Sequence, residues 1–299
     1  MDEPKVILIT GCSSGLGRAA AEVLSGKGYR VYAGMRESGG RNAEVASMLR
    51  SLNQSPRFLR VLDLDICSDS SVAAAVEETL RDAGKIDVLV NNAGVFAVGP
   101  AEAFRIDQWK ALFETNLFGA VRMNRAVLPS MRQRKAGMLV HISSVAGRSV
   151  GPGMAVYCAS KSALAMLAEA YRYELAPFGI DSLLIEPFVY PTGIHERFSR
   201  PADESRAAEY LRLTDLENRQ VRFFQTVLKS PNAGNPAELG EKVDELIRTP
   251  LGKRPLHTVL PASMQERYKP VDTVLDHFRQ RSMETVGFKD LLEQRAREP

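Results

Sequence analysis

Short apolar runs alternate along this chain with longer stretches of helical periodicity, and this alternation restricts the folds open to it. The run Val6-Ile7-Leu8-Ile9 contains no polar residue, as expected of a strand covered on both faces. Strands separated by helices predict βαβ units, and hence an α/β fold with a doubly wound parallel sheet and helices on both faces. The expected strands are residues 6–9, 30–33, 57–62, 86–90, 138–142, 180–185 and 257–260, and the expected helices are residues 16–24, 70–83, 106–133 and 157–176.

The 299 residues are enough for one large domain with an appended tail. We expect a single domain over residues 1–260 and a C-terminal helical extension over 261–299, in which Pro261 and Pro270 break the chain before a helical stretch to Arg297. Residues 193–235 interrupt the alternation, because charged and aromatic residues are interleaved there. Two interpretations stay open: a solvated helical excursion whose aromatic side chains rejoin the core, or a lid over an apolar substrate pocket.

Composition argues against several classes of protein. The net charge is only +3 and no block of Lys or Arg stands out, so nothing favours nucleic-acid binding. No apolar run approaches the roughly 18 residues of a membrane-spanning helix, and residues 1–4 lack the basic start of a signal peptide. Cys12, Cys67 and Cys158 are far apart, which disfavours a disulfide framework and a zinc site. We therefore expect a cytoplasmic protein without a metal centre.

A glycine-rich turn follows the first expected strand and opens the first expected helix. Glycines let a backbone turn tightly and approach a phosphate, which free N–H groups at a helix start can bind. The spacing is G-x-x-x-G-x-G, so the common G-x-G-x-x-G fingerprint is not met. The residues predicted to hold a nucleotide here are Gly11, Ser13, Ser14, Gly15, Leu16 and Gly17.

A second turn of small residues ends the fourth expected strand, where open α/β sheets bind their ligands. In this turn Asn92, Ala93 and Gly94 would let a cofactor lie against the backbone. A simple Asn-rich turn is the alternative interpretation.

Tyr157 and Lys161 lie four residues apart, so on a helix the Lys161 charge is expected near the Tyr157 oxygen. A nearby positive charge stabilises a phenolate and lowers the pKa of a phenol from about 10. A tyrosine tuned in this way exchanges protons near neutral pH, as a general acid/base must. The pair alone is weak evidence, because many helices carry it by chance.

These motifs, taken in order along the chain, resemble the short-chain dehydrogenase/reductase family over about residues 5–260. Gly-Cys-Ser-Ser-Gly and Tyr-Cys-Ala-Ser-Lys bring the pattern nearest to the steroid- and retinoid-oxidising members. The resemblance implies a Rossmann-like sheet that binds a nicotinamide dinucleotide. It assigns Asp65 to the adenine amino group, Asn92 and Gly94 to the adenosine side, and Thr192, after Pro187, to the nicotinamide carboxamide.

The resemblance also implies the catalytic residues. Ser144 lies thirteen residues before Tyr157, the family spacing, and would hold the substrate carbonyl, whereas Ser143 is expected to bond locally. Asn116 matches the family's helix-interrupting asparagine, whose backbone carbonyl holds a water that links Lys161 to solvent. Tyr157 would exchange a proton with the substrate oxygen while Lys161 lowers the tyrosine pKa and binds the nicotinamide ribose.

The choice of dinucleotide is expected at the end of the second strand. An NAD enzyme usually places a carboxylate there to accept the ribose 2′-hydroxyl, and Met35 cannot do so. Arg36 offers a planar charged donor for a 2′-phosphate, and Ser14 and Arg41 could add donors. We therefore expect NADP(H) rather than NAD(H), with an unselective site as the alternative.

One position departs from the family pattern. Phe188 stands where the family commonly has glycine after Pro187, so the local backbone path could differ. With Tyr190 it would make the pocket beside the nicotinamide apolar, or else it simply packs in the core.

The expected function is therefore the interconversion of a hydrophobic ketone and its secondary alcohol, with a substrate of steroid, retinoid or similar bulk. A catalytically silent NADP(H)-binding regulator is the alternative from another class, and a dehydratase or epimerase the alternative among enzymes. Subunits of family members usually associate through two long central helices, so the resemblance implies a homodimer or homotetramer.

Overall fold

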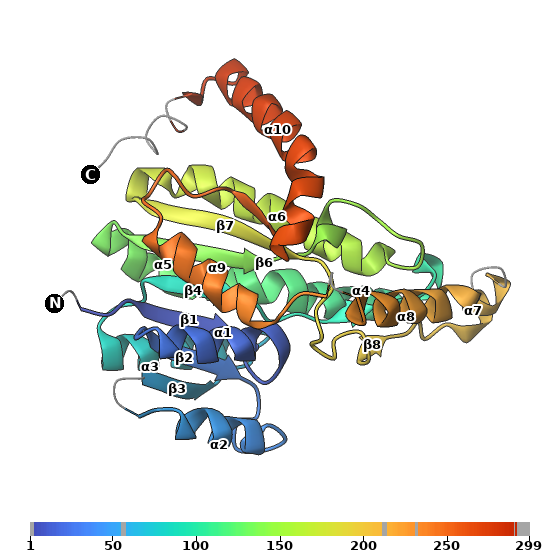
Figure 1. The fold of residues 1–299 in the computed structure, drawn as a ribbon, viewed down its shortest axis with the longest axis horizontal. Helices are drawn as coiled ribbons and strands as arrows, with labels where there is room; N and C mark the ends of the chain where they lie inside the picture. Colours follow the sequence, from blue (N-terminus) through green and yellow to red (C-terminus); the bar gives the residue numbers. More distant parts are fainter. Residues whose placement is uncertain (1–2, 55–57, 211–213, 231–232, 290, 292–299) are drawn as a thin grey trace.

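A seven-stranded parallel sheet forms the centre of the protein in a computed structural model that describes residues 3–54, 58–210, 214–230, 233–289 and 291 (Figure 1). The strand order is β3-β2-β1-β4-β6-β7-β9, so the order reverses beside β1, where doubly wound sheets open a crevice. The strands are β1 (Val6–Thr10), β2 (Arg30–Met35), β3 (Phe58–Asp63), β4 (Val88–Asn91), β6 (Gly137–Ile142), β7 (Ile180–Pro187) and β9 (His257–Leu260).

Helices cover both faces of the sheet, which confirms the expected doubly wound α/β fold. On one face lie α1 (Gly15–Gly26), α2 (Ala43–Ser51) and α9 (Ala237–Arg248), and on the other lie α3 (Asp69–Ala83), α5 (Gly119–Arg134) and α6 (Ala155–Glu174). Neighbouring residues of one strand point to opposite faces of the sheet. Ile7 packs in the core under α1, α2 and α9, and Leu8 packs in the core under α3 and α5. Arg57, the expected start of the third strand, lies outside the described residues.

The long helix expected over residues 106–133 is not continuous. A π-helical turn, η2 (Glu114–Phe118), separates α4 (Ile106–Phe113) from α5. The continuous helix expected from periodicity is therefore wrong at this point. Asn116 lies at the centre of the interruption, where the resemblance implied a helix-interrupting asparagine. Such bulges frequently mark functional sites.

The segment over residues 193–235 extends beyond the carboxyl ends of the strands (Figure 1). A two-stranded sheet ties it to the body, because β8 (Phe198–Ser199) pairs with β5 (Phe96–Ala97), which follows β4. Its helices are α7 (Glu204–Glu209), which packs near η1 (Ala101–Ala103), and α8 (Thr214–Leu228). Residues 211–213 and 231–232 of this segment lie outside the described part. Phe224 is buried and Phe223 is 45% exposed, so the aromatic residues rejoin the core only in part.

The C-terminal extension begins with one helix, α10 (Ala262–Thr285), which leaves β9 and projects away from the body (Figure 1). Arg279 of this helix pairs with Glu169 of α6. The expected break at Pro270 is wrong, because this proline lies inside α10. A proline removes one helical hydrogen bond, and the side chains that dock α10 keep the helix whole. The expected stretch to Arg297 lies mostly outside the described residues.

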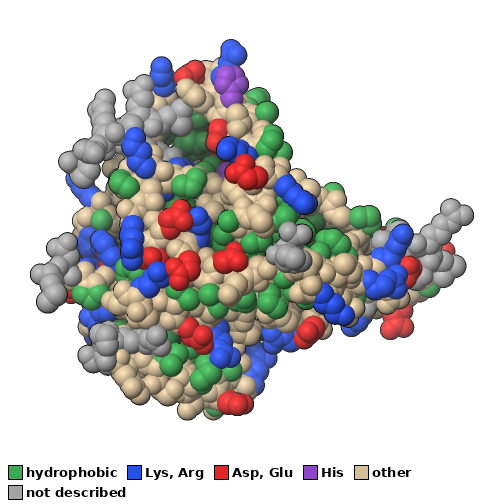
Figure 2. All heavy atoms as spheres, in the orientation of Figure 1, with side chains coloured by type: hydrophobic (Ala, Val, Ile, Leu, Met, Phe, Trp, Pro, Cys, Tyr) green, Lys and Arg blue, Asp and Glu red, His purple; other side chains and the backbone are tan. Residues whose placement is uncertain are grey.

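Acidic and basic side chains are interspersed over the face drawn in Figure 2, in keeping with the small net charge. Within the described residues, no helix combines the length and the apolar character that crossing a membrane requires.

Candidate active site

A cavity of about 960 Å³ lies at the carboxyl edge of the sheet and runs from the glycine-rich turn to α8. It brings together most of the residues predicted from the sequence. Those that line it are Gly11, Ser13, Ser14, Gly15, Leu16, Arg36, Asp65, Asn92, Ala93, Gly94, Ser144, Tyr157, Lys161, Pro187 and Thr192. Gly17 and Asn116 are not among the residues that line it.

The glycine-rich turn is packed too closely for side chains. A Cβ atom on Gly11, where φ is +73°, would lie 2.8 Å from the Ala93 Cα. A Cβ atom on Gly17 would lie 2.2 Å from the Asn92 Nδ2 and 2.6 Å from the Gly11 carbonyl oxygen. The turn can therefore expose its backbone N–H groups to the cavity only because these positions are glycine.

Asn92 joins the two turns through its side chain. Its Nδ2 donates to the carbonyl oxygens of Thr10 at 2.8 Å and Gly11 at 3.2 Å. The Thr10 Oγ1 accepts in return from the backbone N–H groups of Asn92 and Ala93, both at 3.0 Å. The sequence interpretation gave Asn92 only a lining role and missed Thr10, although Thr10 begins the glycine motif.

Asn116 is buried and bonds the segment that follows Gly94. Its Oδ1 accepts from the Val95 N–H at 2.8 Å, and its Nδ2 donates to the Val95 carbonyl and to the Ser160 Oγ, both at 3.0 Å. This side chain thus joins the loop after β4 to α6. The π-helical turn places it there, since the interruption changes the direction of the residues it contains.

Ser144 begins a short 3-10 helix, η3 (Val145–Gly147), at the end of β6. Its hydroxyl accepts from the Ala146 N–H at 3.1 Å and donates to the Pro187 carbonyl at 3.4 Å, which links the ends of β6 and β7. The Ser143 hydroxyl donates to the Lys161 carbonyl at 3.0 Å, so it bonds locally, as expected. Of the two serines, Ser144 is the one whose hydroxyl also bonds with Tyr157.

Tyr157 and Lys161 are both buried, and burial decides their pKa values. Burial raises the pKa of Tyr157 to about 12, although the hydrogen bond with Ser144 acts in the opposite direction. Burial also lowers the pKa of Lys161 to about 8. The Lys161 Nζ donates to the Ile142 carbonyl at 2.8 Å and lies 5.9 Å from the centre of the Tyr157 ring. Desolvation thus has the largest effect on the pKa of Tyr157 in this structure, and a lowering of that pKa by Lys161 stays a prediction.

Aromatic side chains form the wall of the cavity beside Tyr157. Phe96 meets the Tyr157 ring edge-on at 4.7 Å, and Phe224 of α8 packs on Phe96 at 5.7 Å. His195 stacks on Phe224 at 3.9 Å, and burial lowers its pKa to about 4, so it is neutral at pH 7. Neither Phe96 nor His195 was found from the sequence, because neither belongs to a motif with its own spacing.

Phe188 and Tyr190 both line the cavity. Phe188 packs edge-on against Phe223 at 6.2 Å, whereas the Tyr190 hydroxyl donates to Glu238 of α9 at 3.0 Å. Among the described residues other than glycine, only Glu37 and Lys135 have a positive φ. Phe188 does not, so a side chain at this position causes no backbone strain.

Cationic side chains lie at the opposite end of the cavity, near the end of β2. Arg36 is exposed and follows the buried Met35. Arg41 pairs with Glu37 at 3.2 Å, and both arginines line the cavity. The Arg197 Nη2 donates to the Ser14 Oγ at 3.2 Å, which joins the segment after β7 to the glycine-rich turn. No carboxylate follows β2 directly, and sequence reasoning missed Arg197, whose partner is distant in the sequence.

The family model of short chain dehydrogenases matches residues 5–202 of this chain. Retinol dehydrogenase 8 of Bos taurus is 41% identical over 189 residues, which cover 62% of this chain and 59% of that protein. The 17-beta-hydroxysteroid dehydrogenase type 1 of Homo sapiens is 37% identical over 255 residues, which cover 82% of this chain and 74% of that protein. The chain thus spans only about three fifths of the length of the retinol dehydrogenase.

Solved structures show the same architecture. A short-chain dehydrogenase from Streptomyces avermitilis superposes with a TM-score of 0.71 at 29% identity, covering 96% of this chain and 98% of that one. A gluconate 5-dehydrogenase from Burkholderia cenocepacia in complex with NADP has a TM-score of 0.60 at 29% identity, covering 65% and 74% of the two chains. A dehydrogenase from Burkholderia phymatum in complex with NAD has a TM-score of 0.72 at 26% identity, covering 92% and 95%. The seven-stranded sheet, the glycine-rich turn and the match over residues 5–202 agree, and the chain belongs to the short-chain dehydrogenase family.

Proposed function

We propose that this protein is an NADP(H)-dependent oxidoreductase that interconverts a bulky hydrophobic ketone and its secondary alcohol, with Tyr157 as the general acid/base. The observation that carries the proposal is the convergence of Tyr157, Ser144 and Lys161 in one cavity. An aromatic wall lies at one end of that cavity, and the glycine-rich turn with its neighbouring arginines lies at the other. Retinol and hydroxysteroids, named in two relatives, are also bulky apolar alcohols, retinol a primary one.

The cavity fits a dinucleotide on its own geometry. The turn containing Gly11 has no room for side chains and presents backbone to the cavity, as phosphate binding requires. Arg36 and Arg41 would hold a 2′-phosphate, while Asp65 and Thr192 would bond the adenine and the carboxamide. When bound, the nicotinamide supplies the hydride for reduction and accepts it for oxidation.

The protein side of the reaction is a proton transfer at the substrate oxygen. When a ketone binds, the Ser144 hydroxyl would turn its single proton from the Pro187 carbonyl to the ketone oxygen. Tyr157 is protonated at neutral pH, since burial raises its pKa to about 12, and it donates its proton to the same oxygen. Lys161 carries its charge below about pH 8 and stabilises the phenolate that remains. In alcohol oxidation these proton transfers run in reverse.

The direct test is NADPH oxidation with bulky ketones by the wild type and Tyr157→Phe. We expect the variant to bind NADPH with unchanged affinity and to lose about 10²-fold to 10⁴-fold in kcat, because only the proton donor is removed. Normal turnover by Tyr157→Phe would overturn the assignment. Tight NADPH binding without turnover of any ketone by the wild type would favour the silent regulator.

The preference for NADP(H) is tested separately at Arg36. Arg36→Ala should weaken NADPH binding by about tenfold to a hundredfold and leave NADH binding within a factor of about two, because only the 2′-phosphate loses a charged donor. Arg50→Ala is the matched control, since Arg50 is an exposed arginine on the neighbouring α2. Equal loss for both dinucleotides would contradict the assignment of Arg36.

We also propose that the protein acts in the cytoplasm as a homodimer or homotetramer that pairs through α5 and α6. Free thiols at all three cysteines accord with a reducing compartment. The exposed Met166 on α6 and Phe118 beside α5 supply apolar surface for such pairing. Light scattering of the purified protein measures its mass, and a monomer at micromolar concentration would contradict the pairing.

A further inference from the structure

Helix α10 is fixed to the body by three side chains spaced seven residues apart. Gln265, Asp272 and Arg279 therefore lie on one face of the helix. Gln265 accepts a hydrogen bond from a backbone N–H of β9 at 2.7 Å, and Asp272 pairs with Arg148. Arg279 donates to Glu169 of α6 at 2.8 Å. The helix is thus held along most of its length by polar contacts, not by a general apolar face.

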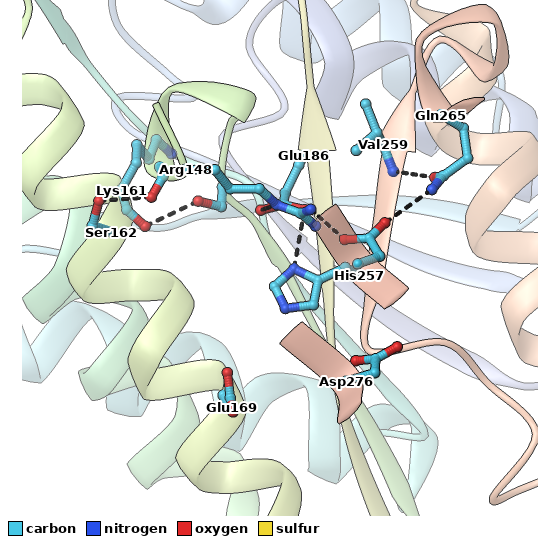
Figure 3. Close-up of polar contacts among 12 residues, drawn as sticks. Arg148, Lys161, Ser162, Glu169, Glu186, His257, Val259, Gln265 and Asp276 are labelled. Carbon is cyan, nitrogen blue, oxygen red and sulfur yellow. Dashed lines mark hydrogen bonds and ion pairs between the residues drawn. The ribbon is translucent and has the colours of Figure 1, made fainter. Parts of the chain in front are cut away.

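Arg148 connects α10 to the loop that carries Ser144. It follows η3 directly and pairs through two nitrogens with Glu186, with the Nε to Oε1 distance 2.8 Å (Figure 3). Glu186 is fully buried and also contacts the His257 Nδ1 at 3.1 Å. The next residue is Pro187, whose carbonyl accepts the Ser144 hydroxyl. The ion pair therefore fixes the two segments that orient Ser144, and Asp272 extends it to α10.

Tyr268 lies on α10 one turn before Asp272 and reaches the cavity. Its ring packs in a cluster with Val145 and Phe188, the residues that follow Ser144 and Pro187. The guanidinium carbon of Arg148 lies 5.6 Å from the ring centre, so the same arginine supports the ring. Phe188 belongs both to this cluster and to the aromatic wall beside Tyr157. The cavity thus has a second apolar wall, contributed by the C-terminal extension.

We propose that α10 is part of the substrate site: Tyr268 is a specificity-determining residue that contacts the extended ring system of a bulky ketone, and the Arg148–Asp272 pair is the positioning contact that holds it there. The inference rests on the proposed function for its substrate class. A one-ring ketone with its carbonyl at Ser144 and Tyr157 has less apolar surface to place against this wall. A ketone with several fused rings extends from the same point along Phe188 and gains the contact with Tyr268.

The experiment compares acetophenone with 1-acetylpyrene, a fluorescent ketone with four fused rings, on the full chain saturated with NADP⁺. Tyr268→Ala should weaken binding of 1-acetylpyrene by about fivefold to tenfold, the value of an aromatic contact, and change acetophenone binding by less than about twofold. Tyr268→Phe keeps the ring and should behave as the wild type. Asp272→Asn should act in the same direction as Tyr268→Ala, whereas Glu266→Gln, an exposed carboxylate on the same helix, is the matched control.

Binding is read from probe fluorescence, so the inference is tested even if neither ketone turns over, and NADPH oxidation is recorded in parallel for the proposed function. Equal losses for both ketones, or no loss for 1-acetylpyrene with Tyr268→Ala, would overturn the role of Tyr268. A wild-type response in Asp272→Asn would overturn the positioning role of the Arg148–Asp272 pair. Circular dichroism of each variant shows that a loss arises in a folded protein.

Discussion

Burial shifts the pKa values of Tyr157 and Lys161 in opposite directions. The neutral phenol and the neutral amine are both favoured by desolvation, so the phenol holds its proton and the ammonium loses its proton more readily. At pH 7 the protonated phenol can donate and the lysine is still charged. A site in this state is prepared for ketone reduction, whereas alcohol oxidation needs the phenolate.

This balance predicts a decline of ketone reduction on the alkaline side. As pH rises through about 8, Lys161 loses its charge, so kcat/KM for the reduction should fall although Tyr157 is still protonated. Lys161→Arg keeps the charge at all these pH values and should abolish the decline, with a lower maximal rate because the guanidinium has a different shape. Initial rates measured between pH 6 and 10 check this. The same alkaline decline in both proteins would assign it to another group.

The close packing at Gly17 predicts a steric effect of substitution on the glycine-rich turn. Gly17→Ala places a methyl group against the Asn92 amide and the Gly11 carbonyl, so the turn and Asn92 must shift. We expect a loss of about 1–3 kcal/mol in the free energy of unfolding, and weaker NADPH binding.

Gly39→Ala is the control for this substitution, since a Cβ atom at Gly39 meets nothing within 4 Å. Urea denaturation and NADPH titration measure the two effects. A stability of Gly17→Ala equal to that of Gly39→Ala would show that the turn adapts without strain.

At the scale of the elements, local patterns predicted the strands well and the interruptions poorly. The apolar run before the glycine-rich turn is sufficient to identify β1. Periodicity did not predict the bulge at η2, because it depends on Asn116 bonding to Val95, a residue that is distant in the sequence. Only the resemblance to the family implied an interruption at Asn116. Likewise Pro270 suggested a break in α10, and the helix continues because Asp272 and Arg279 find partners on other elements. Tertiary contacts outweigh local propensity in both places.

Removal of the ion pair between Arg148, which follows η3, and Glu186 of β7 should strongly lower the stability of the protein. Arg148→Met leaves the buried Glu186 without its main cationic partner, and removing one partner of a buried pair costs about 3–5 kcal/mol. Arg222→Met is the control, since the pair of Arg222 with Asp215 is more than half exposed. Guanidinium-induced unfolding measures both variants. A small loss for Arg148→Met would mean that His257 alone compensates the Glu186 charge.

At the scale of the whole molecule, the parallel sheet explains why residues distant in the sequence form one site. The ends of β1, β4, β6 and β7 meet at one edge, so the motifs that follow them converge, and this much could be predicted from the sequence. The contributions of Arg197 and Tyr268 could not, because they come from segments whose docking depends on single long-range contacts. The residues proposed for catalysis thus follow from the ends of the strands, whereas those proposed to contact substrate depend on tertiary packing.

The last prediction concerns the acid stability of the whole molecule. His141 is fully buried on β6 beside Asn91, and burial lowers its pKa to about 3. An unfolded chain protonates the same histidine near pH 6.5, so the unfolded state binds one more proton between about pH 3 and 6.5. The stability associated with neutral His141 is therefore complete above about pH 6.5 and falls with pH below it, by up to about 1.4 kcal/mol per pH unit.

His141→Asn, which cannot take up this proton, should unfold with a free energy whose slope between pH 6.5 and 4 is smaller by about that amount. His277→Gln should keep the wild-type slope, because His277 is exposed on α10. Urea denaturation at a series of pH values measures the slopes, and it separates them from any constant loss caused by the new side chain in the core. An unchanged slope in His141→Asn would mean that the buried histidine does not link folding to protonation, and that acid unfolding begins instead at the carboxylates.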